Sequence, residues 1–258
     1  ACVGCLSDAE CTTAGASVCG ETQECGACAT DADCDHDGLP TACVAGVGCF
    51  VCNEDDTESD DCDGAAPVCD ATSRACRACT EHTECAAGLC LDGTCPAEGD
   101  ILWVDGDDDA CDDAGSGSSA APFCQIQAAL DDGSAELIAV REDVSDDYAP
   151  ISWVSGGSAT IVAVEPGASI FQRTATEPAV RCINGSTLTV VGMTITGRKE
   201  GTVTGPGITT SACTLTATDV NVSGNGGAGI SATGGTVTLT DVNVSGNGDA
   251  GLVASAGA

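Results

Sequence analysis

Cysteine is the residue whose spacing in this chain most directly suggests chemistry. The 258 residues include 21 Cys, of which 17 lie within residues 1–99. From Cys5 onward these cysteines fall into four units of four, with two residues between each unit and the next. So many thiols persist in one chain only when they are oxidised or bound to a metal. The units are Cys5, Cys11, Cys19, Cys25; Cys28, Cys34, Cys43, Cys49; Cys52, Cys62, Cys69, Cys76; and Cys79, Cys85, Cys90, Cys95.

Two disulfides in each unit are the preferred interpretation, and zinc is the alternative. Pairs such as Cys25-x-x-Cys28 have the spacing of zinc knuckles, but each pair crosses a boundary between units. The chain has only two His, although Cys79-x-x-His82-x-x-Cys85 keeps a metal-ligand spacing. Four cysteines allow three connectivities, and the spacing does not choose among them.

The remaining cysteines extend the disulfide interpretation. We expect Cys111 to pair with Cys124 and Cys182 with Cys213, which leaves Cys2 as the odd cysteine. The position of Cys2 before the first unit predicts a partner upstream of Ala1. Because disulfides persist in oxidising compartments, the sequence predicts a secreted protein, extracellular or at the cell surface.

Alternating aspartates suggest calcium as the ligand or cofactor. Oxygen ligands at alternate positions followed by Gly are typical of the first half of a calcium-binding loop. An EF-hand would need a Glu where the chain has Val44, so that motif is excluded. The predicted calcium ligands are Asp33, Asp35 and Asp37, and Asp105, Asp107 and Asp109.

Carboxylate pairs and basic residues that could catalyse a reaction are few beyond residue 150. Asp219 and Asp241 occupy equivalent repeat positions, so they could share a cation or a proton, but a solvated outer ladder is the preferred interpretation. Arg198, Lys199 and Glu200 lie in a segment with five more residues than its counterpart one repeat later, and insertions in solenoids often form binding loops. No catalytic residue is assigned, and the balance is against an enzyme.

Net charge excludes one class of partner. The chain has 40 acidic and 7 basic residues, which gives a net charge of -33 and excludes a nucleic-acid-binding protein. The acidity lies mainly in residues 1–99 and 100–150, whereas residues 151–258 carry only six acids and four basic residues. No apolar run approaches 18 residues, so no transmembrane segment is predicted.

Two unlike kinds of element must position these residues. A four-cysteine unit of about 25 residues is too small to be stabilised by apolar burial alone, so residues 1–99 are expected to form an irregular, disulfide-rich repeat rod.

In the second half, Asp219-Val-Asn-Val-Ser-Gly-Asn-Gly recurs from Asp241, a period of 22 residues. Period-2 alternation within each copy predicts short strands, and this spacing fits one turn of a three-sided parallel β-helix.

The register of the repeat predicts which residues stack. The expected inward columns are Leu188, Leu215 and Val237; Met193, Val220 and Val242; Ile195, Val222 and Val244; and Ile208, Ile230 and Leu252. Asn225 over Asn247 predicts an amide ladder at a turn. The coil also stops partway round a turn at Ala258, so residues 136–258 are expected to be an incomplete β-helix with an open end.

Residues 100–135 contain an expected acidic junction and cap. Trp103-Val-Asp-Gly precedes an Asp-rich loop and Ala120-Ala-Pro-Phe-Cys-Gln-Ile-Gln-Ala-Ala-Leu, in which Cys124 to Leu130 is predicted to form a short helix that ends near Gly133. This string resembles the N-terminal cap of secreted bacterial right-handed parallel β-helix proteins of the pectate-lyase-like superfold. The repeats that follow resemble those of bacterial polymorphic surface proteins. The upstream cysteine repeats are similar to those of myxobacterial-type surface proteins. The resemblance implies an all-β, right-handed parallel β-helix with a short N-terminal capping helix, and it leaves the activity open because this superfold includes lyases, hydrolases, adhesins and fibre shafts.

Three functional hypotheses follow. The preferred one is an extracellular structural or adhesive surface protein, in which a cysteine-rich stalk carries a β-helix shaft that forms a homo-oligomer or filament through its open end. The second is a polysaccharide lyase or hydrolase of the same superfold. The third is a calcium-dependent module that binds a glycan or a cell surface.

Overall fold

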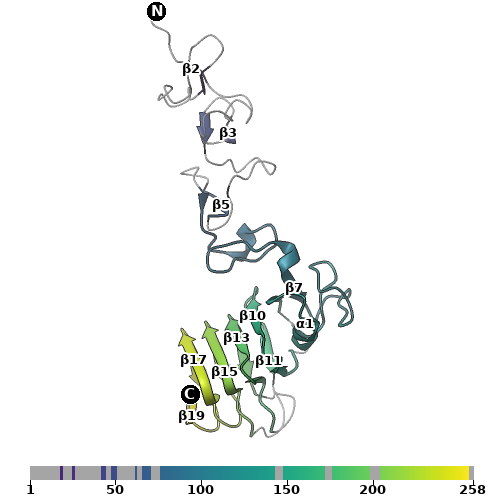
Figure 1. The fold of residues 1–258 in the computed structure, drawn as a ribbon, viewed down its shortest axis with the longest axis vertical. Helices are drawn as coiled ribbons and strands as arrows, with labels where there is room; N and C mark the ends of the chain where they lie inside the picture. The colour runs from purple at the N-terminus through teal and green to yellow at the C-terminus, as the bar shows by residue number, and fades with distance from the viewer. Residues whose placement is uncertain are drawn as a thin grey trace, which may run out of the picture. The chain divides into compact units, whose positions relative to one another are not determined.

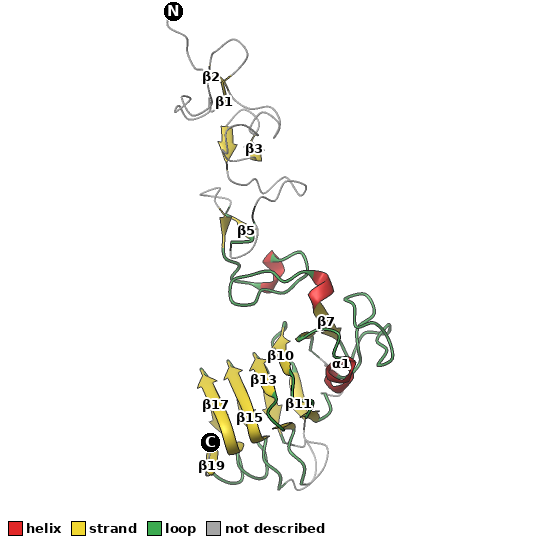
Figure 2. Ribbon diagram, in the orientation of Figure 1, coloured by secondary structure: helices red, strands yellow, loops and turns green. Residues whose placement is uncertain are grey.

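A computed structural model describes residues 62, 66–70, 76–142, 148–171, 176–197 and 204–255, together with the backbone of four short strands nearer the N-terminus. The chain divides into two compact units, Ala1–Pro96 and Ala97–Ala258 (Figure 1). Strands account for most of the regular structure in both units (Figure 2).

The first unit is built on antiparallel hairpins that repeat with the cysteines. The paired strands are β1 (Val18–Cys19) with β2 (Cys25–Gly26), β3 (Ala42–Val44) with β4 (Gly48–Phe50), and β5 (Val68–Cys69) with β6 (Cys76–Arg77). In each hairpin the third and fourth cysteines of a unit lie opposite each other, as Cys19 lies opposite Cys25, Cys43 opposite Cys49 and Cys69 opposite Cys76. In the last unit an antiparallel bridge between Leu91 and Thr94 places Cys90 and Cys95 in the same relation.

The second unit is a parallel β-solenoid of about four turns, which confirms the predicted fold class. Its strands stack in three rows, all with parallel pairing. The first row contains β7 (Ile101–Val104), β8 (Leu137–Val140), β10 (Ser158–Ala163), β13 (Thr187–Val191) and the second halves of β15 (Ile208–Thr218) and β17 (Ile230–Thr240). The second row contains β11 (Ser169–Phe171), β14 (Thr194–Thr196), β16 (Asn221–Ser223) and β18 (Asn243–Ser245). The third contains β9 (Ile151–Trp153), β12 (Val180–Ile183), the first halves of β15 and β17, and β19 (Leu252–Ser255).

The stacking register matches the predicted columns. Three of these columns pair in register from one coil to the next. They are Leu188, Leu215 and Val237; Ile195, Val222 and Val244; and Ile208, Ile230 and Leu252. The period-2 alternation directs one set of side chains inward in every coil, and these residues form the continuous core of the solenoid.

A single α-helix covers the core at the start of the solenoid. Helix α1 (Ile126–Asp132) buries Ile126, Ala129 and Leu130 and ends at Gly133, whose φ of 63° is the left-handed conformation favoured at helix C-termini. The predicted helix began at Cys124. In the structure the Asp113 carboxylate instead accepts the backbone N–H groups of Cys124 and Gln125 at 2.9 Å, and the helix begins after them.

Two asparagine ladders connect the later coils. Asn225 is 1% exposed and donates from Nδ2 to Oδ1 of Asn247 at 3.0 Å and to the Ile195 carbonyl at 3.3 Å. Asn247 in turn donates from Nδ2 to the Val222 carbonyl at 3.0 Å. This is the predicted ladder. A second, exposed ladder joins Asn243 to Asn221 at 3.2 Å.

Candidate functional site

The disulfides of residues 1–96 follow one crossing pattern in the four-cysteine units that the structure describes. Cys79 pairs with Cys90 and Cys85 with Cys95, so the first cysteine of this unit joins the third and the second joins the fourth. In the preceding unit Cys62 joins Cys76, again second to fourth. Cross-strand neighbours carry their side chains on one face of a hairpin, so the third and fourth cysteines of a unit lie on the same face.

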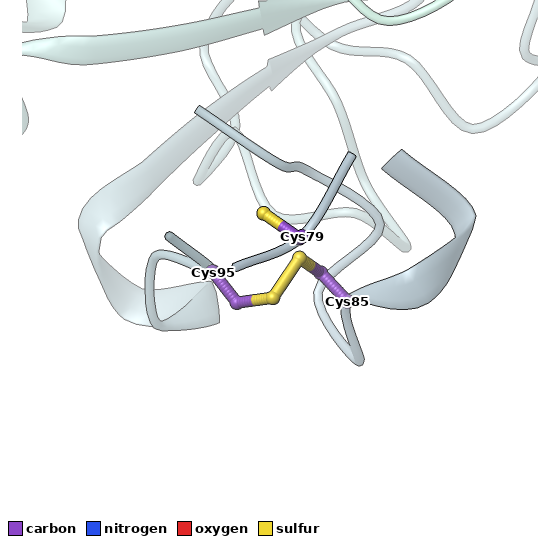
Figure 3. A group of neighbouring side chains, drawn as sticks. All are labelled: Cys79, Cys85 and Cys95. Carbon is purple, nitrogen blue, oxygen red and sulfur yellow. A yellow bond between two sulfur atoms is a disulfide. The ribbon is translucent and has the colours of Figure 1, made fainter. Parts of the chain in front are cut away.

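Three of these sulfur atoms form the closest group of metal-ligating atoms among the described residues. The Sγ atoms of Cys79, Cys85 and Cys95 lie within 4.8 Å of one another (Figure 3). All three are oxidised in disulfides, so in this state they offer no thiolate, the form of cysteine that binds zinc. His82 belongs to the predicted zinc alternative, and here its Nδ1 accepts the backbone N–H of Cys90 at 3.0 Å.

A charged cluster joins the last two cysteine units. Arg77, in the two-residue linker, forms ion pairs with Asp70 on one side at 3.7 Å and with Glu84 on the other. Glu84 also accepts the backbone N–H of Thr80 at 2.7 Å. The hydrogen bond from Arg77, followed by that from Thr80, lowers the pKa of Glu84 from 4.5 to about 2. The carboxylate of Glu84 therefore stays ionised well into the acid range.

The solenoid contains the two disulfides that the sequence analysis paired. Cys111 bonds to Cys124, which links the Asp-rich loop to the segment before α1. Cys182 bonds to Cys213 inside the core, where their exposed fractions are 0% and 1%. The second bond lies between adjacent coils, because Cys182 belongs to β12 and Cys213 to β15.

The Asp-rich loop uses several of its carboxylates for contacts within the protein. Asp105 forms an ion pair with Arg141 at 3.3 Å and accepts the backbone N–H of Asp107 at 3.2 Å. Asp112 accepts the N–H of Ala114 at 2.9 Å. Within the described residues, donor atoms of three His, Cys, Asp or Glu side chains approach within 4.8 Å only at the cysteine group, so Asp105, Asp107 and Asp109 are not brought together in that way. Calcium binding at this loop stays a prediction.

The structural position of Arg141 was not predicted from the sequence. Its guanidinium lies 4.7 Å from the centre of the Trp103 ring, and its carbonyl accepts the Tyr148 hydroxyl at 2.7 Å. Trp103 is 2% exposed and lies beside the Asp-rich loop, where its backbone N–H donates to the Gly117 carbonyl at 2.7 Å. These contacts fix the loop to the first strand of the solenoid.

The remaining predicted site residues fall into two groups. Asp33, Asp35 and Asp37, and the inserted Arg198, Lys199 and Glu200, lie outside the described residues. Asp219 and Asp241 are exposed and adopt φ values of 53° and 52°, a left-handed turn conformation that Asp tolerates better than most residues. Their geometry suits a repeated turn residue on the outside of the solenoid.

The last described coil exposes the side chains that are buried elsewhere. Leu239 is 36% exposed and Leu252 is 50% exposed, whereas Ala217 and Ile230, one coil earlier in the same columns, are 0% exposed. Strands β18 and β19 are the last members of their rows. We call the inward-facing residues of this coil the terminal apolar row; they are Val237, Leu239, Val242, Val244 and Leu252.

Comparisons with known proteins found no protein-family model, curated protein or solved structure that matches this chain. Among the described helices, none combines the length and apolar character needed to cross a membrane.

Proposed function

We propose that this protein is an extracellular structural or adhesive surface protein, in which disulfide-linked units carry a β-solenoid shaft. The disulfides support an oxidising location, and the repeated coils support a scaffold role. The resemblance of the cap and repeats to bacterial parallel β-helix surface proteins points in the same direction. The function proposed for the shaft is to associate with a second copy of itself.

The terminal apolar row is the observation that carries this proposal. A solenoid coil buries its inward residues against a neighbouring coil, and an unpartnered coil presents both apolar side chains and open strand edges. Leu239 and Leu252 lie together with half-buried Val237, Val242 and Val244 on this surface. An exposed apolar surface of this kind is typical of a protein–protein contact.

The first and last described coils of the solenoid differ, and this difference suggests a geometry of association. At the first end α1 places Ile126, Ala129 and Leu130 over the core, so that end has no open coil for a partner. Head-to-tail growth would have to displace α1. We therefore propose that two terminal apolar rows meet about a two-fold axis, which gives a closed pair of shafts instead of a filament.

Light scattering on the whole chain, coupled to size exclusion, tests this proposal. The wild type is expected to have twice the mass of one chain at high concentration. Leu239→Ser combined with Leu252→Ser is expected to give single chains with an unchanged circular dichroism spectrum. Val253→Ser is the matched control, because Val253 is 43% exposed but pairs with Ser231 on the outward side of the same strand.

Three results would contradict the proposal. The first is a wild type that stays a single chain at high concentration, and the second is a loss of association in Val253→Ser as large as in the double variant. The third is a series of masses above two chains, which would replace the closed pair by open-ended growth.

A further inference from the structure

A hollow of about 330 Å³ lies where the end of α1 meets the first coils of the solenoid. Small side chains leave this space open, among them Ala129, Ala135 and Ala159. Ala159 is the informative one, because it pairs in register with Leu188, and Leu188 pairs with Leu215 in the next coil. Alanine therefore stands in this column at the coil where the hollow opens, whereas the next three coils carry Leu188, Leu215 and Val237. The volume of the hollow is about that of a small ring-shaped ligand.

One wall of the hollow is the indole of Trp153, which is held in place by two hydrogen bonds. Its Nε1 donates to the carbonyl of Gly157 at 3.2 Å and to that of Thr187 at 3.1 Å. Trp153 is 8% exposed, and it lies with Leu130 and Ile138 among the residues around the hollow. The site thus has a rigid aromatic wall and an apolar floor, and neither needs ordering when a ligand enters.

The polar groups around the hollow are acidic or neutral. Asp131 and Glu136 supply carboxylates, Ser155 and Ser158 supply hydroxyls, and no Lys or Arg is among the lining residues. Asp131 is positioned by Gln127, whose Nε2 donates to its Oδ1 at 2.8 Å. The unit around the hollow is also acidic, with 21 Asp and Glu against 5 Lys and Arg in residues 97–258. These charges favour a cationic ligand.

We propose that this hollow binds an amino sugar with an unsubstituted primary ammonium, such as a glucosamine residue of a surface polysaccharide. One pyranose ring fits the volume, and its C–H face suits the indole and the apolar floor. The ammonium pairs with the carboxylates of Asp131 and Glu136, and the ring hydroxyls hydrogen-bond to Ser155 and Ser158. This goes beyond the proposed self-association, and it stands even if the shaft is a single chain, because every lining residue belongs to one chain.

Calorimetric titration of the full chain with glucosamine tests the proposal, with glucose, N-acetylglucosamine and ethanolamine as comparison ligands. Glucosamine is expected to bind and to change the tryptophan fluorescence. Glucose and N-acetylglucosamine lack the ammonium, and ethanolamine lacks the ring, so each is expected to bind at least about tenfold more weakly, a difference of about 1.4 kcal/mol. Equal binding of glucose would overturn the role of the carboxylates. Equal binding of ethanolamine would overturn the sugar as the ligand.

Two variants separate the contribution of charge from that of shape. Glu136→Gln removes one carboxylate and is expected to weaken glucosamine binding about tenfold. Ala159→Leu restores the leucine of the column, fills the hollow without changing the charge, and is expected to abolish binding while the thermal unfolding midpoint is maintained. Asp249→Asn, outside the hollow, is the charge control and is expected to bind like the wild type. Undiminished binding in Ala159→Leu, or no binding in the wild type, would overturn the proposal.

Discussion

At the scale of single residues, Glu84 is predicted to stay ionised at an unusually low pH. Its pKa in the folded chain lies below the usual value of 4.5, at about 2, because Arg77 and the Thr80 N–H donate hydrogen bonds to the carboxylate. A carboxylate with a lowered folded pKa stabilises the fold above its unfolded pKa, and this contribution is lost as the pH falls through the folded pKa. The ion pair is therefore expected to persist at pH 4 and to be lost near pH 2.

An NMR titration of the side-chain carboxyl carbons measures this directly, with the Glu84 signal assigned by its absence in Glu84→Gln. The expected midpoint is about 2 in the wild type. Arg77→Ala removes the largest cause of the shift and should raise the midpoint toward 4.5. Asp92→Asn changes an exposed acid of the same cysteine unit and should leave it in place. A wild-type midpoint near 4.5 would show that Arg77 does not hold Glu84.

At the scale of elements, the two asparagine ladders offer a matched comparison. Asn225→Ala would remove the side-chain donor to the Ile195 carbonyl and to Oδ1 of Asn247, although the backbone N–H of residue 225 still donates to that Oδ1, and the expected loss is about 1–3 kcal/mol in the free energy of unfolding. Asn243→Ala breaks an equivalent but exposed ladder, where water replaces the lost partner, and the expected loss is about 0.5 kcal/mol. Chemical denaturation of the two variants decides the point. Equal losses would mean that burial of the ladder does not contribute to stability.

The same elements show how much of the fold could be predicted from the sequence. The stacking of Leu188 on Leu215, and of Asn225 near Asn247, was predictable because a 22-residue repeat with period-2 alternation specifies both the inward face and the register. The start of α1 was not predictable, because Asp113, outside the helix, engages the N–H groups that precede it. The crossing disulfides could not be predicted either, since three connectivities share one spacing of four cysteines.

The candidate site residues also differ in whether the sequence could predict them. Cys182 and Cys213 could be paired from the sequence, because few cysteines remained outside the units. The hollow beside Trp153 gave no sequence signal, because it depends on where the end of α1 meets the turn after β9. The exposure of Leu239 and Leu252 was not predicted, because the repeat specifies that they face inward but not how far a neighbouring coil covers them.

At the scale of the whole molecule, the proposed self-association requires the terminal apolar row to be a contact between two copies. Among the described coils, the first is covered by α1 and the last exposes Leu239 and Leu252, so the proposal places the contact at the last described coil. Pairing would bury the outer edges of β18 and β19 and protect their backbone N–H groups from exchange with solvent. Self-association therefore predicts a protection that depends on protein concentration.

Hydrogen–deuterium exchange at two protein concentrations is the most direct measurement. The amides on the outer edges of β18 and β19, which do not donate to the preceding coil, are expected to exchange quickly in dilute protein and to become protected as the concentration rises. Those of β15, which is paired on both sides within one chain, should exchange equally slowly at both concentrations. Exchange in β18 and β19 that is the same at both concentrations would contradict self-association through the last coil.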